Sequence, residues 1–212
     1  MTVLQRLRSP FRYSYFNASL VLIGINVLVY ALGTMFRELP LYLGMMPIAM
    51  VRLGWIWQPF TYMFVHGSLQ HLLFNMLGLF FFGSYVEREL GSKEFLLYYL
   101  LVGTLAGIFS FGAYAVTGAW GVRLVGASGA VYAVLLAFAV INPRARIYIW
   151  GLVPVPAAVL VGAYTVMELW SEIFSYGGNI AHLTHLAGFG FGALYFPVRH
   201  KVNPIRRLIS GH

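Results

Sequence analysis

The chain has 212 residues, of which 60% are hydrophobic and only 9% are charged. A soluble domain carries roughly 25% charged residues, so this composition excludes an ordinary soluble protein and predicts an integral membrane protein. The formal net charge of +8 would favour a nucleic-acid partner in a soluble chain. In a chain this apolar, Lys and Arg beside membrane helices account for the charge, and we expect no nucleic-acid partner.

A membrane-spanning helix needs about 20 mainly apolar residues, with a usual range of roughly 17–25. Because such stretches follow one another along the chain, we do not interpret the first as a cleavable signal. We predict an all-α membrane protein, a bundle of six transmembrane helices in a single domain over residues 1–212, with short basic tails at 1–16 and 200–212. The six predicted helices are 18–36, 69–87, 94–116, 127–142, 147–170 and 183–199.

The distribution of Lys and Arg predicts the orientation of the helices. With a cytoplasmic N-terminus, the segments on the inner side hold eleven of these residues and the outer segments hold three. Because inner loops of membrane proteins are enriched in Lys and Arg, we predict that both termini are cytoplasmic. A small chain of this kind is expected in the cell inner (cytoplasmic) membrane as a multi-pass protein.

The connection at 37–68 is unusual, because it mixes three prolines with Trp55, Trp57 and other apolar groups. It is too interrupted to span the membrane and too apolar to be a mobile aqueous loop. Since Trp favours the membrane interface, we predict a structured first loop that is partly embedded in the outer leaflet.

The fourth helix is short. Ser128 to Asn142 is 15 residues, or roughly 22 Å of helix against a hydrocarbon core of about 30 Å. Its N-terminal end should therefore lie below the outer surface. Irregular backbone at that depth is tolerated only inside protein or beside water. We expect Ser128 to face a water-filled cavity that opens to the outside.

Polar side chains inside membrane helices are candidates for function. His71 and Asn75 are four residues apart and share one helix face, and His66 lies just before that helix. An imidazole N–H and a carboxamide NH₂ side by side are two donors that can stabilise an oxyanion. Alternatively, both groups only tie neighbouring helices together.

A possible nucleophile lies at the start of the fourth helix. Gly126 and Gly129 flank Ser128, so the backbone can turn tightly and expose the hydroxyl near free N–H groups. Tyr132 lies one turn further along the same face. Small residues are also common where membrane helices pack, so a packing role remains an alternative.

A possible base lies on the sixth helix. Gly188 and Gly192 form a small-residue stripe that allows close approach of another helix. His185 precedes Gly188 by three residues and lies at the top of the stripe, where the helix beginning at Ser128 is the natural partner. The Ser, the His and the two donors all lie near the outer ends of their helices.

These motifs resemble those of the rhomboid intramembrane serine proteases in their minimal six-helix bacterial form. The resemblance covers roughly residues 15–200 and is carried by HGSLQHLLFN at 66–75, GASGAVY at 126–132 and HLAGFGFG at 185–192. Such proteases use a Ser–His dyad without an acidic third member, in agreement with the absence of Asp from this chain. The resemblance implies that Ser128 is the nucleophile and His185 the general base. It also implies an oxyanion hole from His71 and Asn75, support of His185 by Tyr132, and a structural role for His66.

Two short motifs lie outside the site. Trp57 is followed by Gln58 where the family commonly has Trp-Arg in its first loop, so that Arg is absent here. Val86-Glu87-Arg88 resembles a family element that ties the cytoplasmic side together.

The resemblance implies peptide-bond hydrolysis through an acyl-enzyme, without a cofactor and without a metal. The expected partners are transmembrane protein substrates and membrane lipid, with substrates cut near the outer end of a helix. Lateral access is expected around 150–180, where prolines and glycines make the chain deformable. These residues are Pro154, Pro156, Gly177 and Gly178. The oligomeric state and the natural substrate are not predicted.

Three other interpretations remain. The first is a catalytically silent rhomboid-like scaffold that binds transmembrane clients. The second is a transporter or channel, although Glu168 is the one candidate for a buried intramembrane carboxylate in the sequence. The third is a metal site, although the chain has no HExxH motif. That site would be built from His66, His71, His182 and His185.

Overall fold

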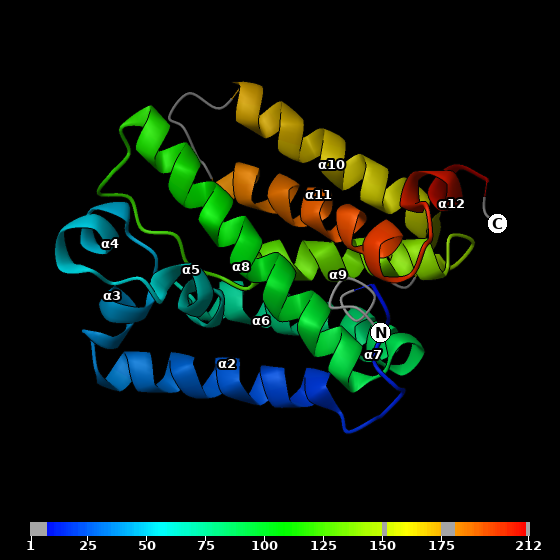
Figure 1. Ribbon diagram of the computed structural model, residues 1–212, viewed down its shortest axis with the longest axis horizontal. Coiled ribbons are helices and arrows are strands. Elements are labelled where there is room, and N and C mark those ends of the chain that lie inside the picture. The colour runs from blue at the N-terminus through cyan, green and yellow to red at the C-terminus, as the bar shows by residue number, and fades with distance from the viewer. Residues whose placement is uncertain (1–7, 150–151, 175–180, 211–212) are drawn as a thin grey trace.

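The structure is a computed structural model that describes residues 8–149, 152–174 and 181–210, and it is a bundle of helices (Figure 1). Short helix α9 lies inside the bundle, and its neighbours include α8, α11 and α10. The main helices are α2 (Ala18–Met35), α6 (Leu69–Gly78), α7 (Ser84–Leu90), α8 (Ser92–Thr117), α9 (Ser128–Ile141), α10 (Ala157–Phe174) and α11 (Ala181–Arg199).

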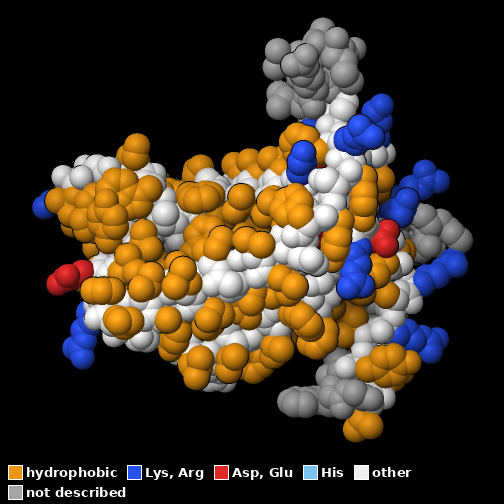
Figure 2. Space-filling model, turned by 90° about the horizontal axis from the view of Figure 1, so that it is seen from below, with side chains coloured by type: hydrophobic (Ala, Val, Ile, Leu, Met, Phe, Trp, Pro, Cys, Tyr) orange, Lys and Arg blue, Asp and Glu red, His pale blue; other side chains and the backbone are white. Residues whose placement is uncertain are grey.

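Three helical stretches in the described part of the chain are long and apolar enough to cross a membrane: Ala18–Met35, Leu69–Leu90 and Ser92–Thr117. Two shorter apolar helices occur at Ser128–Ile141 and Ala157–Met167. Apolar side chains cover the middle of the molecular face in Figure 2, while Lys and Arg gather mainly at one end. This arrangement is that of a membrane protein, and the number of crossings stays a prediction.

The second predicted helix is longer and less regular than expected. It runs past residue 87 to Leu90, where Gly91 ends it with a φ of 83°. Within it, Leu79–Gly83 forms a π-helical segment, η2, between α6 and α7. Such segments add one residue to a helical turn and often occur at functional sites. No periodicity in the sequence marked this irregularity.

The prediction of a fifth helix from residue 147 is wrong at its start. The structure has an antiparallel hairpin there, with β1 (Arg146–Ile149) paired to β2 (Val153–Pro156). The helix begins only at Ala157. Pro154 and Pro156 lack the N–H that a helix interior needs, so the chain stays extended until the second proline is passed.

The first loop is structured, as predicted. It contains α3 (Leu39–Leu43), α4 (Pro47–Leu53), α5 (Gln58–Thr61) and the 3₁₀ turn η1 (Tyr62–Phe64).

Gln58 holds this loop together at the position where the resemblance implies Arg. Its side chain is fully buried. The carboxamide donates to the carbonyl of Tyr42 at 3.2 Å and accepts from the N–H of Met46 at 3.0 Å. A neutral amide therefore satisfies backbone groups on both sides of the α3–α4 connection.

Replacing Gln58 with Ala is expected to lower the free energy of unfolding by about 2 kcal/mol, because buried backbone groups lose their partners. The measurement is thermal or SDS-induced unfolding in detergent. Gln70→Ala is the matched control, since Gln70 is exposed. An equal effect of the two substitutions would show that Gln58 does not hold the loop.

The two carboxylates Glu87 and Glu94 anchor the N-terminal segment at one end of the bundle. Glu87 accepts from the backbone N–H of Ala18 at 2.6 Å and of Ser19 at 2.8 Å, so it caps the start of α2. Glu94 accepts from the N–H of Phe11 at 3.0 Å. Glu87, the middle residue of the Val-Glu-Arg motif, and Glu94 thus tie this end together.

The same Glu94 also binds the end of α11. Arg199 donates to it through two nitrogens, at 2.8 Å and 2.5 Å, and Tyr195 donates at 2.5 Å. The chain entering α2 and the chain leaving α11 therefore meet at one end. Beyond Arg199, the predicted basic tail contains a further short helix, α12 (Pro204–Ser210).

Candidate active site

Ser128 is the first residue of α9, and Gly126 shapes the turn before it. Gly126 has a φ of 120°, which residues with a side chain rarely adopt. A methyl group at this position would also lie 2.6 Å from the His71 ring. The glycine therefore serves both the turn and the close approach of His71.

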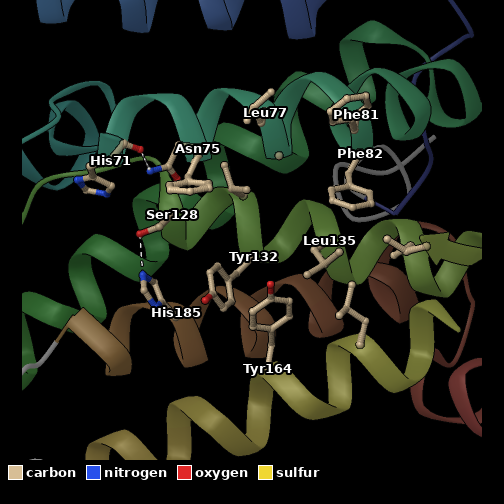
Figure 3. A pocket seen from close by; sticks show the side chains of 15 residues that line it. His71, Asn75, Leu77, Phe81, Phe82, Ser128, Tyr132, Leu135, Tyr164 and His185 are labelled. Carbon is tan, nitrogen blue, oxygen red and sulfur yellow. Dashed lines mark hydrogen bonds between the residues drawn. The ribbon is translucent and has the colours of Figure 1, made fainter. Parts of the chain in front are cut away.

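His185 of α11 lies beside Ser128, with 2.7 Å between its Nε2 and the serine Oγ (Figure 3). The two residues are 57 positions apart in the chain. Gly188 permits this approach, because its Cα faces the backbone of Gly129, and a methyl group there would collide with the Gly129 carbonyl oxygen. The predicted small-residue stripe thus packs against the helix that begins at Ser128.

Replacing Gly188 with Ala is expected to lower the free energy of unfolding by about 3 kcal/mol, because backbone on both sides must move. Gly190→Ala on the same helix is the matched control, since a methyl group there meets no atom within 4 Å. Thermal unfolding of both variants measures the difference. Equal stability of the two variants would mean that the close packing of α9 on α11 at Gly188 does not contribute to the free energy of unfolding.

Tyr132 stacks on the His185 ring, and the resemblance implies that it supports this ring. The two rings stack with centroids 4.4 Å apart and an angle of 11° between their planes. Phe189 and Tyr164 contact Tyr132 edge-on, at 5.1 Å and 5.8 Å. The imidazole is therefore held between the serine hydroxyl and an aromatic cluster.

His71 and Asn75 face the same space as Ser128. Asn75 is buried and donates one amide hydrogen to the His71 carbonyl at 2.9 Å. The π-helical segment follows less than two turns later, and Gly78 lets Val131 of α9 pack closely on α6. Two polar side chains from α6 thus converge on the serine from the side opposite His185.

His66 lies next to His71 and does not line the cavity. Its Nε2 is 3.5 Å from the backbone N–H of Ala127, and its ring is 5.0 Å from that of His71. Burial and the neighbouring His71 lower the pKa of His66 to about 4. A neutral imidazole can accept a hydrogen bond from the turn, which agrees with a structural role.

Ser128 and His185 open into a cavity of about 560 Å³ between α6, α9 and α10 (Figure 3). Its walls beyond the polar group are apolar, and several aromatic rings line them. Among these residues are Phe74, Leu77, Phe81, Phe82, Leu135, Leu160 and Tyr164. Such a space suits an apolar chain segment more than a small polar solute.

The region expected to admit substrate is described only in part. Pro154 and Pro156 belong to β2, while Gly177 and Gly178 lie outside the described residues. The cavity itself extends between α6 and the first half of α10, through Leu160 and Tyr164.

Ser110 and Thr184 were not predicted as site residues, and their contact fixes the position of α11. Their hydroxyls are 2.7 Å apart and join α8 to α11 directly beside His185. Both side chains are buried. A hydroxyl in an apolar helix was the available signal, but the partner on another helix is not visible in the sequence.

The alternative metal site has no geometric support in the described residues. Within residues 8–149, 152–174 and 181–210, no three His or Glu side chains are grouped as metal ligands. His66 lies behind His71, while His185 is engaged with Ser128.

Comparison with known proteins agrees with these motifs. A family model described as the Rhomboid domain matches residues 53–202. RHOMBOID-like protein 12, mitochondrial, of Arabidopsis thaliana is 32% identical over 148 residues, which are 63% of this chain and 44% of that protein. Rhomboid protease GlpG of Klebsiella pneumoniae (strain 342) is 30% identical over 140 residues, which are 64% of this chain and 46% of that protein.

GlpG of Salmonella paratyphi A is 29% identical over 141 residues, which are 65% of this chain and 46% of that protein. The chain thus spans less than half the length of these curated relatives. The matched region contains the Ser128 turn, the His185 helix and the cavity between them. The chain belongs to the rhomboid family.

Proposed function

We propose that this protein is an intramembrane serine endopeptidase that cleaves transmembrane segments of other proteins. One observation carries the proposal: Ser128 and His185 are hydrogen-bonded at 2.7 Å beside an apolar cavity. A hydroxyl within reach of an imidazole is the arrangement that activates serine as a nucleophile.

In the proposed reaction, the Ser128 oxygen attacks the carbonyl carbon of the scissile bond as His185 takes the hydroxyl proton. His185 then donates that proton to the leaving nitrogen, and the acyl-enzyme remains. Water attacks the ester carbonyl carbon as His185 accepts its proton. His185 then passes that proton to the Ser128 oxygen as the ester C–O bond breaks, which releases the carboxylic acid and restores the hydroxyl. The chain supplies every group for these steps, so the proposal includes no cofactor or metal.

Stacking on Tyr132 fixes the plane of the His185 ring while its charge changes. The near-parallel stacking, with 11° between the ring planes, resists tilting of His185, and the 2.7 Å contact with the Ser128 Oγ sets the direction of Nε2. A base held in one orientation loses less entropy in reaching the transition state.

The oxyanion hole in this proposal consists of the Ser128 N–H and side-chain donors from His71 and Asn75. Ser128 begins α9, so its N–H is among the unpaired donors at a helix start. Both α6 side chains line the same cavity from the opposite wall. Removing one such donor commonly costs about 10²–10³ in kcat.

The proposed substrate is a membrane-spanning segment that reaches the cavity between α6 and α10. The aromatic lining suits an apolar chain, and water must enter from the outer end of the short helix α9. This assignment implies six crossings, both termini in the cytoplasm, and a location in the inner membrane. The distribution of Lys and Arg supports that orientation.

Labelling with a fluorophosphonate tests the proposal. Purified protein in detergent and in liposomes should form a covalent adduct that mass spectrometry locates on Ser128. It should also cut a transmembrane reporter at a discrete bond. Absence of both labelling and cleavage across several reporters would instead favour the silent scaffold, which shares the fold.

A further inference from the structure

A second apolar groove lies on the far side of α9 and α10 from Ser128. Its volume is about 680 Å³, and α9, α10, α11 and α12 all contribute to its walls. The lining is almost entirely aliphatic and aromatic, and it includes neither Ser128 nor His185. Its walls include Leu136, Val161, Gly162, Phe189, Ile205 and Ile209.

The C-terminal helix α12 closes one end of this groove with an amphipathic face. Ile205, Leu208 and Ile209 recur at helical spacing and all line the groove. Arg206 and Arg207 lie on the other side of the same helix, where Arg206 is exposed and Arg207 is half-exposed. The helix that closes the groove therefore carries two cationic side chains, neither of which lines the groove itself.

This end of the molecule is strongly basic. Lys and Arg side chains gather there in Figure 2, and Lys201 lies three residues before α12. Two of the carboxylates at this end, Glu87 and Glu94, are buried and hydrogen-bonded within the bundle. They leave the positive charge at the surface largely uncompensated.

We propose that this groove, with α12, is a binding site for an anionic phospholipid. An acyl chain would occupy the apolar groove, and the phosphate would bind the guanidinium groups of Arg206 and Arg207. Basic pockets between membrane helices bind anionic head groups, and Arg pairs with phosphate through two hydrogen bonds. A phospholipid carries both groups on one molecule: its apolar chain matches the groove, and its phosphate matches the arginines of α12.

The apolar groove and the basic helix beside it favour a lipid over a second copy of the chain as the occupant. Binding by another protein helix would match the apolar walls but would leave the paired arginines without a partner. The site shares only Phe189 with the aromatic cluster beside His185, and the variants that test it leave Phe189 unchanged, so it stands or falls independently of proteolysis.

Native mass spectrometry in detergent tests the site. The probes are phosphatidylglycerol and phosphatidylcholine with identical acyl chains, added to the purified full chain. The wild type is expected to retain the anionic lipid about tenfold better. Replacing both arginines (Arg206→Gln with Arg207→Gln) should abolish that preference. The same change at the opposite end, Arg37→Gln with Arg52→Gln, should preserve it.

A second pair of variants tests the groove itself. A side chain at Gly162 would extend into open space, since a methyl group there meets no atom within 4 Å. Gly162→Leu should therefore fill the groove and reduce retention of both lipids. Gly24→Leu, at an exposed glycine of α2 that is equally free of neighbours, should change neither.

Unfolding measurements in lipid-free detergent check that each variant is folded. If Gly162→Leu does not fold, the variant with both arginines replaced tests the proposal on its own. Equal retention of the two lipids by the wild type would overturn the proposal. So would a preference that survives the Arg206 and Arg207 changes. A dimer that Gly162→Leu dissociates without altering lipid retention would assign the groove to a second copy instead.

Discussion

Replacing Ser128 or His185 with Ala is expected to reduce cleavage of a transmembrane reporter by about 10⁴-fold or more. Each substitution removes one half of the pair joined at 2.7 Å. Because the two groups act as a unit, the double variant should be no slower than either single one. The measurement is the initial rate of reporter cleavage in liposomes, with the three variants compared at equal protein.

The matched control for the nucleophile is Ser210→Ala, an exposed serine of α12 that should keep the wild-type rate. Thermal unfolding of Ser128→Ala should be close to that of the wild type, because the change removes only one hydroxyl. Cleavage that persists in Ser128→Ala would refute the mechanism. A double variant far slower than both single ones would show that the two residues act separately.

Replacing Glu94 with Gln is expected to lower the free energy of unfolding by about 3–5 kcal/mol. The substitution keeps the shape of the side chain but leaves the Arg199 charge without its partner. Both side chains are buried, with exposed fractions of 0% and 7%. Because Glu94 also holds Phe11, the segment entering α2 should loosen as well. Unfolding by SDS titration measures the loss.

Glu89→Gln is the matched control, since Glu89 is an exposed carboxylate at the same end of the bundle. Adding Arg199→Met to Glu94→Gln should recover part of the loss, because the unpaired charge is then removed. Stability equal to that of the Glu89 variant would contradict the role assigned to Glu94.

The lengths of the apolar segments and the positions of the charged residues between them were sufficient to predict most of the helices. The observed α2, α8, α9 and α11 begin and end within two residues of the predicted segments. Burial in lipid demands that backbone groups bond within a helix, so a long apolar stretch has few alternatives.

The elements that the sequence did not reveal depend on contacts outside themselves. The hairpin of β1 and β2 pairs two short segments, each too short to show a period of its own. The π-helical segment at Leu79–Gly83 inserts one residue without changing the composition. Helix α12 lies against α9 and α11, which the basic tail alone did not indicate.

For the candidate site, the sequence by itself determined which chemistry was available. With no Cys and no Asp, only a few polar groups in apolar helices remained, and the glycines around Ser128 and Gly188 marked where helices approach closely. These local properties depend on residue type and spacing along one helix.

Only the tertiary structure decided which groups meet. The Ser128–His185 distance depends on the backbone contact between Gly188 and Gly129 and on the Ser110–Thr184 bond. Glu94 is joined to residues 83 and 105 positions away. Such pairings follow from the packing of whole helices, because a side chain's distant partner is set by geometry that no local pattern contains.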